Sequence, residues 1–257
     1  SFRNEITPGN FIFRVREFEQ MEIEFFNYPK DAPAKFDEYI KQIENFLFNV
    51  LKIKKENIRM SEHDKADLSH YSARTIDFQY NFPHGWAELW GLANRTDFDL
   101  SNHQKLSGST LGYLDPETNE RFIPYVIEPS VGVERLFYAV ICDAYRIENV
   151  KDGETREVLG LPYALCPYKV AVLPLSNKLN DNAKKVFDKL IAANVPSVYD
   201  VTGSIGKRYR RQDAIGTFYC ITYDFNSEKD NCVTIRNRDT MKQDRIKIDE
   251  ILNYLNK

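Results

Sequence analysis

The hydrophobic patterning of the chain changes near its middle, and this change limits the possible folds more than any other feature. Before residue 148, most segments alternate apolar and polar residues, as strands with one buried face do. After residue 160, short apolar strands alternate with helical stretches. The polar segment ENVKDGETREVLG at 148–160 predicts a boundary or an exposed loop. A chain of 257 residues accommodates two domains, and we expect them over 1–160 and 161–257.

The first part predicts an antiparallel α+β domain. The turn signal Thr7-Pro8-Gly9-Asn10 joins two strand candidates into an antiparallel pair. In the second of them, one face is core-like and carries Val15, Met21, Ile23 and Phe25. We expect strands over 2–6, 14–26, 75–82, 86–94 and 121–127, and helices over 33–52 and 131–144.

The second part predicts a small α/β domain, because its strands and helices alternate along the chain. We expect strands over 170–173, 198–201, 218–224 and 232–236, and helices over 183–191 and 248–255.

Charge also separates the two parts. From Leu161 onward, 16 Lys and Arg stand against 11 Asp and Glu, a net of +5, whereas residues 1–160 carry −8. Nucleic acid is the natural partner of the basic part. No run of about 18 apolar residues exists, so we expect no membrane span. The four cysteines form no CxxC pair and the four histidines no HxxxH pair, which excludes the common zinc motifs and fits a reducing cytoplasm.

One group of candidate functional residues lies on the polar face of the first two strands. It has two interpretations. In the first, the charges are a solvated strand face with weak cross-strand ion pairs. In the second, arginine forks neutralise phosphates, a phenylalanine ring receives a base, and carboxylates hold an amine or a metal ion. The group consists of Arg3, Glu5, Arg14, Arg16, Phe18 and Glu22.

A second group lies in EPSVGVER at 128–135. Its small residues predict a turn that opens an apolar helix, and Gly132 would let a ligand approach the backbone there. Arg135 would then lie in the first turns of that helix, facing either a ligand or a nearby carboxylate of Glu134 or Glu128. The third group is the basic stretch GKRYRRQD at 206–213. It is either a solvated helix face or an RNA contact in which Arg and Tyr meet bases and phosphates.

These motifs resemble those of the dimeric class II glycyl-tRNA synthetases. Residues 2–26 look like motif 2 of class II enzymes, and 132–135 look like motif 3. ELWGLANRTDFDL at 88–100, together with EPSVGVER, points to the glycine enzymes, and 161–255 is similar to their anticodon-binding domain. The chain begins Ser1-Phe2-Arg3 without Met, within the first strand of motif 2. We therefore interpret it as the C-terminal portion of a longer protein, and the full-length protein is expected to be a homodimer.

The resemblance implies roles for individual residues. Arg3 would hold the α-phosphate of ATP and Arg135 the γ-phosphate, both as catalytic residues, while Phe18 stacks on adenine and Glu88 helps to hold Mg²⁺. The implied ATP contacts are Arg3, Asn4, Glu5, Phe13, Arg14, Val15, Arg16, Glu17, Phe18, Glu88, Leu89, Gly132, Val133, Glu134 and Arg135. The implied glycine contacts are Phe18, Glu19, Gln20, Met21, Glu22, Arg95, Glu128, Pro129, Ser130, Val131 and Gly132. The implied contacts to tRNA are Arg208, Arg210 and Arg211, with Arg236 and Arg238 as a second set.

The function implied by the resemblance is ATP-dependent activation of glycine to glycyl-adenylate, followed by transfer to tRNA(Gly) for protein synthesis in the cytoplasm. The glycine carboxylate is already ionised, so the first step requires positioning and charge neutralisation rather than a general base. The alternative is a non-catalytic RNA-binding or accessory protein derived from a class II synthetase. A protein without catalysis has no physical need for the charges found together here, which favours the enzyme. These charges include Arg3, Glu5, Glu88, Glu128 and Arg135.

Overall fold

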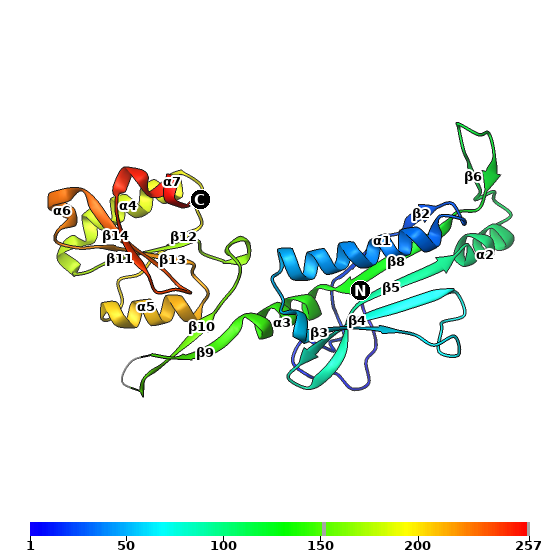
Figure 1. Cartoon of the computed structure of the whole chain (residues 1–257), viewed down its shortest axis with the longest axis horizontal. Helices are drawn as coiled ribbons and strands as arrows, with labels where there is room; N and C mark the ends of the chain where they lie inside the picture. The colour runs from blue at the N-terminus through cyan, green and yellow to red at the C-terminus, as the bar shows by residue number, and fades with distance from the viewer. Residues whose placement is uncertain (151–152, 256–257) are drawn as a thin grey trace. The chain divides into compact units, whose positions relative to one another are not determined.

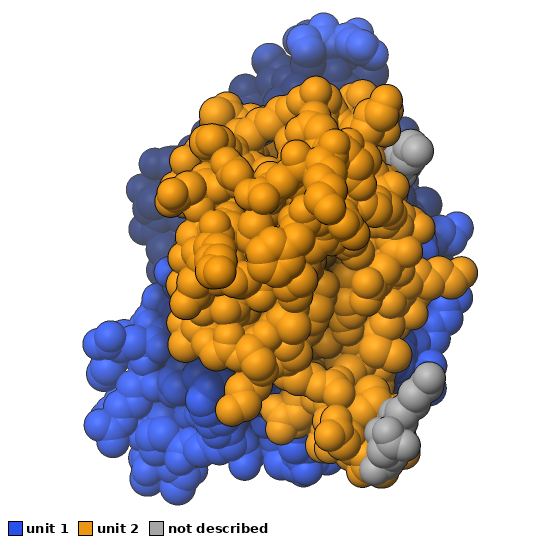
Figure 2. Space-filling view, turned by 90° about the vertical axis from the view of Figure 1, so that its left-hand side faces the viewer, with its two compact units in different colours: residues 1–143 blue, residues 144–257 orange. Residues whose placement is uncertain are grey.

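A computed structural model of the chain describes residues 1–150 and 153–255. Its contacts divide the chain into two compact units, residues 1–143 and 144–257, which Figure 2 distinguishes by colour. We expected the boundary after residue 160. The difference arises because much of the polar segment forms a hairpin instead of a loop. Strands β9 (Tyr145–Asn149) and β10 (Thr155–Leu159) pair antiparallel, and they belong to the second unit.

Unit 1 (residues 1–143) is built on a six-stranded sheet whose paired strands are all antiparallel (Figure 1). The strand order is β1-β8-β5-β4-β3, and β2 continues the β1 edge along β8. The predicted antiparallel α+β architecture is confirmed, and β4 and β5 match the expected strands. The strands are β1 (Gln20–Glu22), β2 (Phe25–Asn27), β3 (Ile58–Glu62), β4 (Arg74–Phe82), β5 (Gly85–Thr96) and β8 (Tyr125–Gly132).

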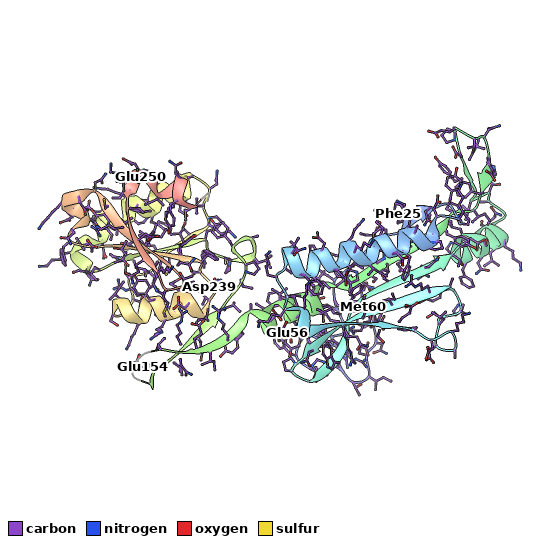
Figure 3. All side chains as sticks on the ribbon, viewed as in Figure 1. Phe25, Glu56, Met60, Glu154, Asp239 and Glu250 are labelled. Atoms are coloured by element: carbon purple, nitrogen blue, oxygen red, sulfur yellow. The ribbon has the colours of Figure 1, made fainter. Side chains whose placement is uncertain are left out.

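Helices cover one face of this sheet and leave the other as an open face. Helix α1 (Ala32–Asn45), continued by a π-helical turn at Phe46–Val50, and helix α3 (Val133–Ala144) supply the covering residues. Alternation along β4 turns Phe78 toward them, and Phe78 is fully buried. Phe25 of β2, which Figure 3 labels, packs against Tyr39 of α1, and their ring centroids are 5.6 Å apart. The core consists of apolar residues from both layers, among them Phe36, Ile43, Leu47, Ile76, Leu92 and Ala139.

The N-terminal segment differs from the prediction. Residues 2–6 and 14–19 are joined only by the isolated bridges Phe2↔Glu17 and Gly9↔Arg14, and regular pairing begins at Gln20. Met21 and Ile23, expected in the core, are 47% and 50% exposed. The physical reason is position: β1 is the edge strand, whereas the helices pack over the central strands.

The segment EPSVGVER also differs from the prediction. Glu128 to Gly132 complete strand β8, and the helix begins at Val133 instead of 131. Alternation explains the strand, because Pro129 and Val131 are buried while Ser130 is partly exposed. The strand expected over 121–127 is divided between β7 (Arg121–Phe122) and the start of β8. The sequence interpretation missed three elements of unit 1: strand β3, helix α2 (Phe98–Ser107) and strand β6 (Tyr113–Leu114), which pairs with β7 in a hairpin.

Unit 2 (residues 144–257) confirms the small α/β domain. In its five-stranded sheet, ordered β12-β11-β13-β14-β15, β11 pairs parallel with β12 and β13 and the other pairs are antiparallel. Helices α4 and α7 pack on one face of the sheet and α5 on the other (Figure 1). The elements are β11 (Val170–Pro174), α4 (Asn180–Ala192), β12 (Ser197–Tyr199), α5 (Ile205–Ala214), β13 (Tyr219–Tyr223), α6 (Ser227–Asp230), β14 (Cys232–Asn237), β15 (Gln243–Lys247) and α7 (Ile251–Leu255).

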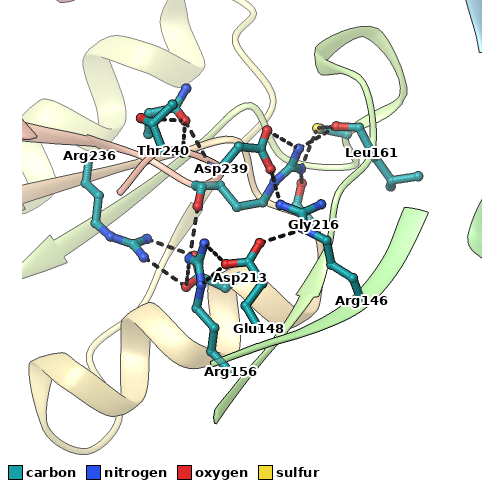
Figure 4. Close-up of polar contacts among 12 residues, drawn as sticks. Arg146, Glu148, Arg156, Leu161, Asp213, Gly216, Arg236, Asp239 and Thr240 are labelled. Atoms are coloured by element: carbon teal, nitrogen blue, oxygen red, sulfur yellow. Dashed lines mark hydrogen bonds and ion pairs between the residues drawn. The ribbon is translucent and has the colours of Figure 1, made fainter. Parts of the chain in front are cut away.

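A buried network of ion pairs joins the hairpin β9–β10 to the rest of unit 2 (Figure 4). Asp213 of α5 is fully buried and accepts hydrogen bonds from Arg236 at 2.8 and 3.0 Å and from Arg156 of β10 at 3.0 Å. Arg146 of β9 pairs with Asp239 at 2.8 Å. Buried charges are tolerated only when they are paired and hydrogen-bonded, so this network holds the hairpin on unit 2.

Candidate nucleotide and amino-acid site

A pocket on the open face of unit 1 gathers residues from both ends of the unit. It encloses about 640 Å³ of empty space, including the solvent-filled space at its entrance. The β5 residues enter it at a β-bulge, where the pairing with β4 shifts register after Phe78, and such bulges redirect side chains. The lining residues are Arg3, Glu5, Ile12, Phe13, Arg14, Val15, Phe18, Gln20, Glu88, Leu89, Ser130, Gly132, Glu134 and Arg135.

Arg135, at the start of α3, is held against two segments that are distant in sequence. Its Nε donates to the carbonyl oxygen of Phe13 at 3.1 Å, and its Nη1 donates to that of Glu88 at 3.2 Å. The guanidinium carbon lies 4.2 Å from the centroid of the Phe13 ring. The Glu88 carboxylate lies 3.4 Å from Nη1 and is half exposed. Arg135 is therefore oriented by backbone carbonyls beside an exposed carboxylate.

The arginines on the opposite side of the pocket are loosely paired. The Arg3 guanidinium carbon lies 5.3 Å from the centroid of the Phe18 ring. Arg14 meets Glu5 at 3.9 Å, near the upper limit for an ion pair, and its side chain is 49% exposed. Weakly engaged guanidinium groups beside an aromatic ring suit a ligand with phosphates and a flat base.

Three carboxylates cluster next to this pocket, on β8 and at the β1 edge. Oxygens of Glu22, Glu24 and Glu128 lie within 4.8 Å of one another. Partial burial, followed by the negative charge of Glu128, raises the pKa of Glu24. Arg95 partly offsets this charge, because it donates to Glu128 at 2.7 Å and to Asp99 at 2.8 Å. The surplus of negative charge favours an ammonium group or a metal cation. We call Glu22, Glu24 and Glu128 the carboxylate cluster.

Ser130 connects the pocket to the carboxylate cluster. Its Oγ accepts a hydrogen bond from Gln20 Nε2 at 2.7 Å and donates to Glu22 Oε1 at 3.3 Å. The backbone register places Glu22 opposite Ser130. The cations of the pocket and the carboxylates of the cluster therefore lie on opposite sides of one small polar side chain.

The structure brings most of the expected ATP residues together, but not all. Asn4, Arg16, Glu17 and Val133 do not line the pocket. The Glu134 carboxylate accepts hydrogen bonds from the Glu19 backbone N–H at 2.9 and 3.1 Å, so it tethers two segments as well as lining the pocket.

Among the expected glycine residues, Val131 and Pro129 are buried on the opposite, core face of β8, so their side chains are not available to a ligand on the open face. Exposed Met21 alternates with Gln20 and Glu22 and points away from them. The residue that sequence reasoning missed is Glu24. Its signal was available, because Gln20, Glu22 and Glu24 alternate on one strand face.

The expected RNA contacts in unit 2 divide into buried and exposed arginines. Arg208 is 4% exposed, and its guanidinium donates to the carbonyls of Pro174, Val201 and Gly203. Its expected contact with tRNA is replaced by this structural role. The same correction applies to Arg236 and Arg238, which are 6% and 1% exposed.

Arg210 and Arg211 remain on the surface, with side chains about 40% exposed. Arg211 is held by Asp200 at 2.7 and 2.9 Å, whereas Arg210 meets Glu154 at 3.5 Å. Glu154, labelled in Figure 3, directly precedes strand β10. These two are the accessible arginines of the basic stretch that we expected to meet RNA, and Lys207 of the same stretch is also exposed.

Two family models match the chain. The model described as "tRNA synthetase class II core domain (G, H, P, S and T)" matches residues 1–145, and "Anticodon binding domain" matches 169–257. The chain therefore belongs to the class II tRNA synthetases. Its similarity extends to a narrower group, because curated relatives named glycine–tRNA ligase are 61% identical over 251 residues in Malacoplasma penetrans and 58% identical over 257 residues in Acetivibrio thermocellus. The resemblance to glycyl-tRNA synthetases is confirmed.

The matches also define how much of a relative the chain represents. It is covered to 98% and 99% in these two alignments but spans only about half, 54%, of each relative. A solved prolyl-tRNA synthetase from Cryptosporidium parvum, complexed with L-proline and AMP, shares the fold with a TM-score of 0.71. At 15% identity, over 99% of this chain and 54% of that one, it supports the fold alone. Within residues 1–150 and 153–255, no helix is long and apolar enough to cross a membrane.

Proposed function

We propose that this protein activates glycine with ATP and transfers the glycyl group to tRNA(Gly). One observation carries the proposal. A pocket with weakly engaged arginines and an aromatic ring adjoins the carboxylate cluster, with Ser130 between them. A nucleoside triphosphate would bind the arginines and the aromatic ring of the pocket, and the ammonium group of a small amino acid would bind the adjoining carboxylate cluster. The names of the curated relatives support the same substrates.

ATP would bind across the pocket. Arg3 and Arg135 would neutralise the phosphates, and Phe18 would receive the adenine ring. Arg135 is held in place by the Phe13 and Glu88 carbonyls, so little reorganisation would accompany the reaction. The half-exposed carboxylate of Glu88 is a suitable oxygen ligand for Mg²⁺. When bound, Mg²⁺ would neutralise charge on the phosphates.

Glycine would bind with its ammonium group at the carboxylate cluster. Its carboxylate would then point toward the α-phosphorus of ATP, attack it and release pyrophosphate. Arg95 would hold Glu128 in position, since it bridges Glu128 and Asp99. Glycine must be selected by excluding larger side chains, because a missing methylene alone changes binding by only about 1–3 kcal/mol. Ser130 and Gln20 occupy space beside the ammonium site and would supply this exclusion.

Unit 2 would bind the tRNA, as the match to an anticodon-binding domain suggests. Arg210 and Arg211 would meet phosphates or splayed bases. Neutralising several phosphates makes such binding strongly dependent on salt. By the same family resemblance, we expect the full-length protein to act as a homodimer in the cytoplasm.

The test is glycine-dependent exchange of pyrophosphate into ATP, with alanine and serine as control amino acids. We expect exchange with glycine only, and loss of exchange in Glu128→Gln, which removes one charge from the carboxylate cluster. Arg16→Ala is the matched control, because Arg16 is exposed and outside the pocket. A chain that binds neither ATP nor glycine would contradict the proposal. If it still bound tRNA, the non-catalytic RNA-binding alternative would replace it.

A further inference from the structure

A second hollow lies on the open face of unit 1 and has no role in the site described above. It encloses about 1100 Å³ of empty space, measured in the same way as for the first pocket, and is mainly apolar. Two of its aromatic rings, Phe26 and Tyr113, are each 53% exposed. Its walls come from β2, helix α2 and the hairpin β6–β7, which Figure 1 shows together at one end of unit 1. The lining residues are Phe26, Asn27, Tyr28, Leu100, Thr110, Leu111, Gly112, Tyr113, Phe122 and Pro124.

The hollow begins directly beside the carboxylate cluster. Glu22, Glu24 and Phe26 alternate on one face of the β1–β2 edge. The register with β8 is continuous, since Glu22 lies opposite Ser130 and Phe26 opposite Val126. Two strand residues span about 7 Å, so Phe26 follows Glu24 by that distance along the sheet. A ligand that contacts Phe26 would therefore lie about 7 Å, the length of two strand residues, from Glu24 of the proposed glycine site.

The aromatic rings of the hollow are held in fixed positions. Tyr28 and Phe122 stack with centroids 4.1 Å apart and planes 20° from parallel, and Tyr113 meets Phe122 edge-on at 5.9 Å. The Tyr28 hydroxyl is hydrogen-bonded to Asp115 of the hairpin. A fixed stack of rings with exposed neighbours is a platform on which a nucleic-acid base can stack without sequence preference.

Polar and basic groups adjoin this platform. A neighbouring hollow that encloses about 760 Å³ of empty space shares Thr110, Gly112 and Phe122 with the first and is also lined by Arg121. Arg121 Nη1 donates to the Gly112 carbonyl at 2.9 Å, which fixes the guanidinium at the rim. A Cβ at Gly112 would lie 3.3 Å from the Phe122 carbonyl, so a side chain would crowd the passage between the two hollows. Lys30 adds a second cation 5.1 Å from the Tyr28 ring centroid.

We propose that these two hollows bind an unpaired nucleotide at the 3′ end of the tRNA, with its base on the aromatic platform and its phosphate near Arg121. The inference rests on the proposed function, in which the terminal ribose must reach the glycyl group. The unpaired nucleotides that carry this ribose would then approach the carboxylate cluster, and the hollow begins about 7 Å from Glu24 on the same face of the sheet. Apolar aromatic walls with a basic rim match a single-stranded nucleotide.

The experiment measures the Kd of the chain for end-labelled tRNA(Gly) and for the same tRNA without its unpaired 3′ nucleotides, at one salt concentration. The variants are Phe26→Ala and Tyr113→Ala. We expect each to weaken binding of the intact tRNA by roughly 5- to 150-fold, the range for loss of one stacked base, and to leave binding of the shortened tRNA unchanged. Phe137→Ala is the matched control, because Phe137 is an equally exposed aromatic (57%) outside the hollow. Phe26→Trp keeps a stacking surface and should retain the wild-type affinity.

The outcomes separate this inference from the proposed function. If the wild-type chain binds no tRNA and shows no glycine-dependent exchange, both fail. If it binds intact and shortened tRNA equally, or if the Ala variants weaken both alike, only the inference is overturned. It is also overturned if Tyr113→Ala alters the sedimentation of the free chain without changing its affinity for RNA, because the hollow would then be a protein contact.

Discussion

Two arginines of the unit 1 pocket, Arg3 and Arg14, differ from the buried arginines of unit 2 in how completely their charges are engaged. In the unit 1 pocket, Arg14 meets its carboxylate at 3.9 Å and Arg3 lies against an aromatic ring. In unit 2, Arg156 and Arg236 share the buried carboxylate of Asp213 at 2.8 to 3.0 Å, and Arg208 is bonded to three carbonyls. A dense run of basic residues therefore does not identify a ligand-binding surface. An arginine that is incompletely paired and lies on an accessible face is a better indication of a ligand-binding surface.

The largest effect is expected from Asp213→Asn in unit 2. It would leave the buried charges of Arg156 and Arg236 without their shared counter-charge, at a cost of about 3–5 kcal/mol in the free energy of unfolding. Asp249→Asn is the control, since the Lys189–Asp249 pair is exposed and such pairs contribute at most about 1 kcal/mol. Urea denaturation measures both. If both variants lost the same free energy of unfolding, the buried network of unit 2 would contribute no more to stability than an exposed ion pair of the same unit.

The next effect is expected from Arg3→Ala in unit 1. Loss of a hydrogen bond to a charged phosphate costs about 1.5–3 kcal/mol, roughly a 10- to 150-fold increase in the Kd for ATP. Because Arg3 is exposed, the free energy of unfolding should change by less than about 0.5 kcal/mol. Titration calorimetry and urea denaturation measure the two quantities. The interpretation of Arg3 as a ligand contact would not survive if Arg16→Ala weakened ATP binding equally.

Ser130→Gly tests the boundary between the pocket and the carboxylate cluster. Removing this side chain frees space beside Glu22 and Gln20, so rejection of alanine should relax by about 1–3 kcal/mol. The measurement is the ratio of exchange rates with alanine and with glycine. An unchanged ratio would show that the hydroxymethyl group does not exclude the larger amino acid.

The smallest effect is expected for a partly exposed ion pair of unit 1, which is less buried than the network around Asp213 but more closely paired than Arg14 and Glu5. His63 and Asp77 meet at 2.8 Å in unit 1, and the hydrogen bond to Asp77 raises the pKa of His63 above 6.5. The pair should therefore stabilise the fold fully below pH 6.5, and its contribution should be lost as the pH rises through the raised pKa. In Asp77→Asn, NMR titration should give a lower pKa for His63. Asp64→Asn is the exposed control, and an equal shift there would exclude the specific pairing.

Much of the fold of unit 1 follows from local patterns. The alternation that buries Phe78 predicted β4, and the helical spacing that buries Phe36 and Leu47 predicted α1. The short elements could not be predicted in the same way. Helix α2 has no buried residue and thus no apolar stripe, and strand β6 has only two residues.

Parts of the candidate site were also predictable. Arg3, Phe18, Glu88 and Arg135 lie around one pocket, as the motifs indicated. Val131 could not be excluded beforehand, because a small-residue turn and the end of a strand look alike in the segment EPSVG. A shift of one residue along a strand reverses the face on which a side chain lies, so only the register of β8 separates Ser130 from Val131.

The sequence by itself determined the periodicities of strands and helices, the class II motifs and the kinds of chemical groups present. Only the tertiary structure decided which charges are free. Asp213 and Arg156 are 57 residues apart, and Ser130 and Glu22 are 108 apart. Burial and pairing arise from such distant contacts, because each depends on segments that meet only when the sheet and its helices have packed. Local sequence therefore identifies an arginine, while packing determines whether its donors are available to a ligand.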